Sequence, residues 1–98
     1  MPAVTIVFWR DIPAQVIVGA GRRAAKVQLS ERFEQAIDRC AMKTGARDSD
    51  AYLAEWRKEP QPEQEGEDMA VARAIADRLE AEYDTARLRA LIDNDGRA

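Results

Sequence analysis

The sequence predicts a small α+β fold in which an antiparallel sheet packs against two to four helices. A run of β-branched and aromatic residues opens the chain, and a second apolar run follows it after a proline-containing turn. Most of the remaining apolar residues recur at helical spacing. At 98 residues the chain is expected to form one domain, because chains usually divide only at much greater length.

The first expected strand is Val4–Trp9, whose apolar side chains occupy both faces, a pattern typical of a strand covered on each side. Arg10–Ala14 predicts a turn, because Asp and Pro favour turns and proline cannot donate to a ladder. Gln15–Val18 predicts a second strand, so the two strands should pair as a hairpin. Ala25–Leu29 alternates between apolar and other residues and predicts a third strand, at the edge of the sheet.

A helix is expected to begin after Ser30 and to continue through Thr44. The Ser30 hydroxyl can accept a free N–H of the first turn, and Gly45 is suited to end the helix. One apolar stripe should face the sheet; it consists of Phe33, Ala36, Ile37, Cys40 and Ala41.

A shorter helix is expected from Asp48 or Ser49, carrying Leu53 and Trp56 and closing before Pro60. The segment 59–68, with two prolines, one glycine and five acidic residues, predicts an exposed linker.

A long helix is expected over about 67–93. Its main stripe consists of Val71, Ala72, Ile75, Ala76, Leu79, Tyr83, Ala86 and Ala90. Leu88, Leu91 and Ile92 lie roughly opposite that stripe. Either Asp84 or Thr85 caps a new helix that turns back, so that all these residues are core, or the terminal helix docks a partner through Leu88, Leu91 and Ile92.

The composition excludes several chemistries. Histidine is absent and Cys40 is the single cysteine, so Ser-His-Asp and Cys-His catalysis and a structural zinc site within one chain are excluded. Cys40 falls on the buried stripe of its helix, where a thiol acts as a small hydrophobe. The sequence therefore predicts no enzyme, no cofactor and no metal site.

Charge is unevenly distributed along the chain. Residues 1–47 carry a net charge of +4 and residues 48–98 a net charge of −7. The two halves either complement each other within the fold or form a basic patch on the first half. The overall charge of −3 argues against binding to duplex nucleic acid. A lone cysteine, no signal peptide and no apolar run near the ~20 residues of a spanning helix predict a cytoplasmic protein that does not enter a membrane.

The densest group of candidate site residues lies around the first turn and the bend that follows. It consists of Trp9, Arg10, Asp11, Pro13, Gln15, Arg22 and Arg23. In one interpretation the three arginines converge and grip a small anion. In the other, Arg10 and Asp11 pair locally and shape the turn, with Trp9 in the core.

The strings that identify a family are Phe8–Ile17 (FWRDIPAQVI), Gly21–Arg23 (GRR), Glu31–Phe33 with Ala36–Asp38, and Asp50–Leu53 with Trp56–Arg57. Over about residues 4–57 this pattern resembles the bacterial virulence factor domain family, which has small stand-alone members and also forms the C-terminal part of longer conserved virulence factor proteins. The family's name records a phenotype and implies no activity. In some bacteria the small stand-alone members of this family look like proteins that accompany folate- and corrinoid-dependent one-carbon enzymes. The resemblance therefore implies an accessory role for this chain.

From these observations we expect a non-catalytic binding or accessory protein that contacts another protein or a second copy of itself. The alternative is a binder of a small anionic or phosphate-bearing ligand that uses the arginines named above.

Overall fold

The protein is described by a computed structural model over residues 3–19, 21–45 and 49–98. Within these residues the strands are β1 (Val4–Trp9), β2 (Ile12–Val18), β3 (Ala25–Gln28) and β4 (Trp56–Gln61). They form one antiparallel sheet in the order β3-β2-β1-β4. The helices are α1 (Glu31–Thr44), α2 (Ser49–Ala54), α3 (Asp68–Glu82) and α4 (Thr85–Asp93), with a 3₁₀ turn, η1, at Gly21–Arg23. The predicted α+β class is confirmed.

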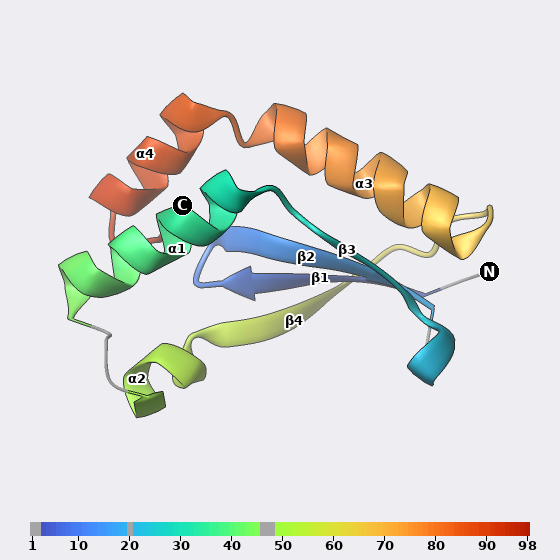
Figure 1. Ribbon diagram of the computed structural model, residues 1–98, viewed down its shortest axis with the longest axis horizontal. Coiled ribbons are helices and arrows are strands. Elements are labelled where there is room, and N and C mark those ends of the chain that lie inside the picture. The colour runs from blue at the N-terminus through green and yellow to red at the C-terminus, as the bar shows by residue number, and fades with distance from the viewer. Residues whose placement is uncertain (1–2, 20, 46–48) are drawn as a thin grey trace.

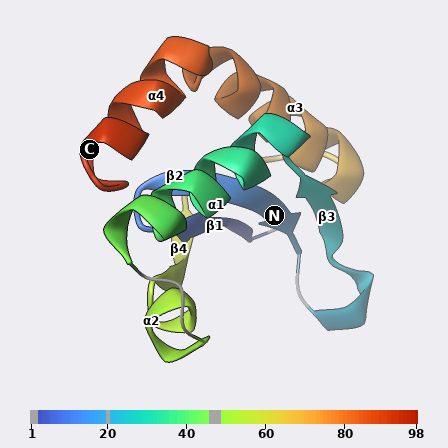
Figure 2. The same cartoon turned by 60° about the vertical axis from the view of Figure 1, so that its left-hand side comes forward.

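The helices lie mostly on one side of the sheet. Figures 1 and 2 show α3 and α4 arching over the strands, with α3 directly on β2 and β3, α1 beside α4 and over β2, and α2 at the start of β4. In β1, Val4 and Ile6 are buried, whereas Thr5 and Val7 are only partly buried. The predicted cover on both faces is therefore only partial at Thr5 and Val7, because the helices pack on one face.

The hairpin is tighter than its sequence indicated. β2 begins at Ile12, so the turn is formed by Arg10 and Asp11, and Arg10 takes a left-handed conformation with φ of 53°. The register shifts beside Phe8, which pairs with Pro13. An irregularity of this kind accommodates a proline inside a strand, since its missing N–H is not needed for the ladder there.

The fourth strand is absent from the sequence prediction. Trp56, expected in a helix, begins β4, and residues 59–61 of the expected linker belong to its end. The first residue of the short helix, Ser49, agrees with one of the two predicted starts, while Asp48 lies outside the described residues. β4 carries exposed charges and Pro60, a composition that only an edge strand tolerates, and its partner β1 lies far away in sequence.

Helix α1 has the predicted bounds and buries all five residues of its predicted stripe. Gly45 follows it in the left-handed region, with φ of 79°. The predicted role of the Ser30 hydroxyl is wrong, because that side chain makes no cap hydrogen bond. Instead the Ser30 hydroxyl and backbone N–H donate to the Glu80 carboxylate at 2.8 and 2.7 Å, so a side chain of α3 holds the start of α1.

Glu80 predicts a pH-dependent contribution to stability. Partial burial alone would raise the pKa of Glu80, but hydrogen bonds from Ser30 and Arg32 and the Arg32 charge outweigh burial and lower it. A carboxylate whose pKa is lowered in the folded state stabilises the fold at pH values above its ordinary pKa of 4.5. This contribution is lost as the pH falls through the pKa of the folded state.

We expect Glu80→Gln to lower the free energy of unfolding by about 1.5 kcal/mol at pH 7, because charge-assisted hydrogen bonds are lost. The difference from the natural protein should shrink below pH 4.5, as measured by urea unfolding across a pH series. Glu82→Gln, on the same helix in a weak exposed pair with Arg78, is the matched control. A difference for Glu80→Gln that stays constant down to pH 3 would contradict this role.

The last segment forms two helices rather than one. α3 ends at Glu82, and the Asp84 side chain accepts the Arg87 N–H at 2.8 Å as the N-cap of α4. Leu88 and Leu91 are 4% and 6% exposed and belong to the core, and Ile92 packs against it. Of the two alternatives, the structure therefore has the new helix capped by Asp84, and a partner-docking face is wrong for Leu88 and Leu91, which the turn at Asp84 points inward, while Ile92 is half-buried. No helix in the described part of the chain has the length and apolar character to cross a membrane.

Candidate functional site

The predicted site around Trp9 and Arg10 is a structural junction. Trp9 is completely buried, and its indole N–H donates to the Tyr52 carbonyl at 3.0 Å. The Arg10 guanidinium lies 5.1 Å from the Trp9 ring centroid, pairs with Glu55 at 3.1 Å and donates to the Asp95 carbonyl at 2.6 Å. These contacts occupy Arg10 within the fold.

Asp11 ties the same turn to the C-terminus and to β4. Its carboxylate accepts from Arg57 at 3.3 Å and from the Ala98 N–H at 2.6 Å, and its own N–H donates to the Gly96 carbonyl at 2.8 Å. Gly96 has φ of 80°, and a Cβ there would meet Arg10 Cδ and Cys40 Sγ at 3.0 Å. The final residues thus run closely across the hairpin turn.

The three arginines of the predicted anion site do not meet. Arg10 precedes β2, whereas Arg22 and Arg23 lie in η1 beyond its other end. Seven residues of β2 separate them, or roughly 20 Å at strand rise. The arginine cluster required by the alternative prediction is therefore not formed, because a strand separates its members.

Two further candidates are part of the sheet. Pro13 is fully buried. Gln15 is half-buried and pairs with Val7 and Gln28. Cys40, on α1, is completely buried, and desolvation raises the pKa of its thiol, as expected for a core residue.

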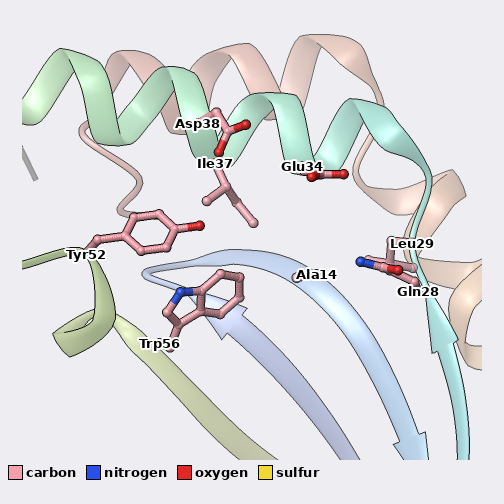
Figure 3. Close-up of a pocket in the computed structure, with 8 residues that line it drawn as sticks. All are labelled: Ala14, Gln28, Leu29, Glu34, Ile37, Asp38, Tyr52 and Trp56. Atoms are coloured by element: carbon pink, nitrogen blue, oxygen red, sulfur yellow. The ribbon is translucent and has the colours of Figure 1, made fainter. Parts of the chain in front are cut away.

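A cavity of about 180 Å³ opens beside this junction, between α1, α2 and the sheet (Figure 3). Its lining comes from β2, from the end of β3 and the residue after it, and from α1, α2 and β4, and consists of Ala14, Gln28, Leu29, Glu34, Ile37, Asp38, Tyr52 and Trp56. We call it the aromatic–acidic pocket.

The helix side of the aromatic–acidic pocket carries two carboxylates. Glu34 and Asp38 stand four residues apart on α1, hence on one flank of the helix. Both are exposed, and neither forms an ion pair or a side-chain hydrogen bond with any residue of the described ranges. Two neighbouring negative charges at the mouth of this pocket therefore have no ion-pair partner among the described residues.

The opposite side of the pocket is aromatic. The Tyr52 and Trp56 rings meet edge to face, with centroids 5.9 Å apart and planes at 80°. Figure 3 shows the Tyr52 hydroxyl directed into the space below α1. Burial, and after it the charge of Asp38, raise the pKa of Tyr52, so this hydroxyl stays protonated at neutral pH.

This combination suits a cation. Aromatic faces attract cations through their quadrupole, and the carboxylates add charge attraction and accept hydrogen bonds. Within residues 3–19, 21–45 and 49–98 no three acidic or cysteine side chains gather as a metal site would require. Aromatic rings beside carboxylates are an arrangement that can hold an organic cation such as an ammonium or guanidinium group.

Sequence reasoning missed Glu34 and Asp38 because charges beside an apolar stripe are typical of a solvated helix face. The one available signal was their spacing of four residues with like charge, which is unfavourable on an isolated helix. The position of Trp56 next to these acids and beside Tyr52 depends on β4, which the sequence did not predict.

Comparison with known proteins identifies the family of the chain. The family model described as "Virulence factor" matches residues 7–92. The match extends beyond the resemblance noted for residues 4–57 and takes in α3 and nearly all of α4, so these helices are part of the family's domain. No curated protein and no solved structure matches the chain significantly. The chain belongs to the virulence factor family.

Proposed function

We propose that the protein is a non-catalytic accessory module that binds a partner protein by receiving one cationic side chain in the aromatic–acidic pocket. The observation that supports this most directly is that Glu34 and Asp38, which have no ion-pair partner in the described ranges, line the same pocket as the rings of Tyr52 and Trp56. A lysine or arginine placed there would meet both kinds of attraction at once.

The size of the pocket favours a side chain over a free cofactor. Its volume of about 180 Å³ lies below the ~300–1,000 Å³ typical of small-molecule sites. A single lysine or arginine side chain, with its charged group and aliphatic part, needs less volume than a typical small-molecule ligand. The protein-interaction role expected from the sequence is therefore proposed at this pocket and not at the hairpin turn.

The proposal needs no catalytic step. The accessory role in virulence or one-carbon metabolism that the family resemblance implies would be decided by which protein supplies the cation. A partner with an exposed lysine or arginine on a protruding segment fits this chemistry.

The test is an NMR titration of the ¹⁵N-labelled protein with Nα-acetyl-arginine amide and Nα-acetyl-lysine amide. We expect the Trp56 indole signal to shift and that of the buried Trp9 to stay in place. Glu34→Gln/Asp38→Asn should weaken binding about tenfold or more, because both charges are removed while shape is kept.

The matched control is Glu63→Gln/Glu65→Gln, which removes the same charge from an exposed segment outside the pocket. Equal affinity for Glu34→Gln/Asp38→Asn and the natural protein would refute the proposal. So would a loss of the same size in the control, because binding would then depend on net charge alone.

A further inference from the structure

The opposite flank of α1 has the opposite charge and packs against α4. At one end Arg32 of α1 donates to the Tyr83 carbonyl and pairs with Glu80 at 3.0 Å. At the other end Lys43 of α1 donates to the carbonyls of Ile92 and Asp93 at 3.0 and 2.9 Å. Lys43 thus fastens α1 to the end of α4, whereas Arg32 fastens α1 to the end of α3, just before α4 begins.

Between these two fastenings lies a groove of about 350 Å³, which we call the α1–α4 groove. Ala36, Leu88 and Ile92 supply its apolar lining, and all three are buried or half-buried. Arg39 of α1 and Arg89 of α4 line it from the two facing helices. An apolar surface beside two cations is the arrangement of a site for an amphiphilic anion.

Within the part of the chain that the structure describes, neither arginine has a partner in the fold. Arg39 and Arg89 are exposed, and no ion pair or side-chain hydrogen bond links either one to the described part of the chain. Arg32, which also lines the groove, is already bound by Glu80. Asp93 lies at the same groove and offsets one of the two free positive charges, which leaves a net positive rim.

We infer that the α1–α4 groove binds a small organic anion in which one carboxylate or phosphate group is attached to an apolar body. The anionic head would be gripped by Arg39 and Arg89, whose planar guanidinium groups match such oxygens in pairs. The apolar body would lie against Ala36, Leu88 and Ile92. This site is separate from the aromatic–acidic pocket and does not depend on the function proposed there.

The volume argues for a small molecule. About 350 Å³ falls at the lower end of the range for small-molecule pockets, roughly twice the volume of the aromatic–acidic pocket. The anion site that the sequence suggested at Arg10, Arg22 and Arg23 thus has its counterpart in a different arginine pair, one that only the packing of α4 on α1 creates.

The test uses octanoate as the probe, followed by isothermal titration calorimetry and by amide chemical shifts of the ¹⁵N-labelled protein. We expect shifts confined to Gln35–Lys43 and Thr85–Asp93, and binding at least tenfold tighter than that of acetate or octanol, which offer the head or the body alone. Octyl phosphate in place of octanoate distinguishes the phosphate from the carboxylate form, and binding of either one with this map supports the site.

Arg39→Ala/Arg89→Ala should reduce affinity for the bound probe at least tenfold, and both residues are exposed, so folding should be kept. The matched control is Arg22→Ala/Arg23→Ala, which removes two exposed arginines at the other end of the sheet and should leave affinity unchanged. Unchanged affinity in the first variant, equal loss in both, or no binding of either amphiphile would overturn the inference. Binding of an acidic peptide at the groove without binding of the amphiphiles would overturn it as well.

Discussion

Trp9→Ala is expected to lower the free energy of unfolding by about 3–5 kcal/mol, the range measured for large aromatic residues deleted from a core. Trp9 is completely buried, its ring lies 5.8 Å from that of Tyr52, and its N–H satisfies the Tyr52 carbonyl. Deleting the side chain would leave a cavity where α2 meets the hairpin and an unpaired carbonyl. Urea unfolding followed by circular dichroism measures the loss.

Trp9→Phe separates the two contributions. It keeps an aromatic ring but removes the donor, so a smaller loss is expected, of which about 1 kcal/mol comes from the hydrogen bond to Tyr52. A loss below 1 kcal/mol for Trp9→Ala would show that this tryptophan is not a core residue and would restore it as a candidate for partner contact.

Leu88→Ala and Leu91→Ala are each expected to lower the free energy of unfolding by about 2–4 kcal/mol, because both side chains are buried. A docking helix would behave differently, since its apolar residues would be exposed in the free protein and their removal would weaken association without loss of stability. Thermal or urea unfolding at low protein concentration therefore distinguishes the two descriptions of α4.

The control for these variants is Leu53→Ala. Leu53 is 62% exposed, so its truncation should change stability by no more than about 0.5 kcal/mol. If Leu88→Ala and Leu91→Ala lay as close to zero as Leu53→Ala, the core position of α4 would be wrong.

The elements that sequence patterns predicted well are those formed by local interactions. β1 and α1 have the predicted bounds, and the α1 stripe is buried throughout. The cap at Asp84 could also be foreseen as one of two alternatives, since an N-cap depends on a side chain and a backbone N–H three residues away. The helical period, the N-cap residue and the terminating glycine all lie within one short stretch of sequence.

The candidate sites could not be predicted in the same way. The α1–α4 groove depends on Leu88 turning inward, and the aromatic–acidic pocket requires β4 to bring Trp56 beside α1. β4 has no strand pattern of its own and pairs with residues about fifty positions earlier. Similarly, the Arg10 side chain donates to the Asp95 carbonyl across 85 positions. Neither β4 nor the Asp95 carbonyl can be recognised from the residues next to it in sequence. The distinctive string Trp9–Gln15 therefore indicated an important region but did not show that Trp9 and Arg10 make contacts within the fold.

By itself the sequence determined the α+β class, the membership of a family, the first strand and first helix, and the absence of imidazole and paired-thiol chemistry, because composition and short-range periodicity decide all of these. Only the tertiary structure decided which charges among the described residues lack an ion-pair partner. The elements that pack beside α1 decide which charged groups lie near the side chains of Glu34, Asp38, Arg39 and Arg89. The packing of these distant elements depends on burial of the whole core, which no single segment of the sequence determines.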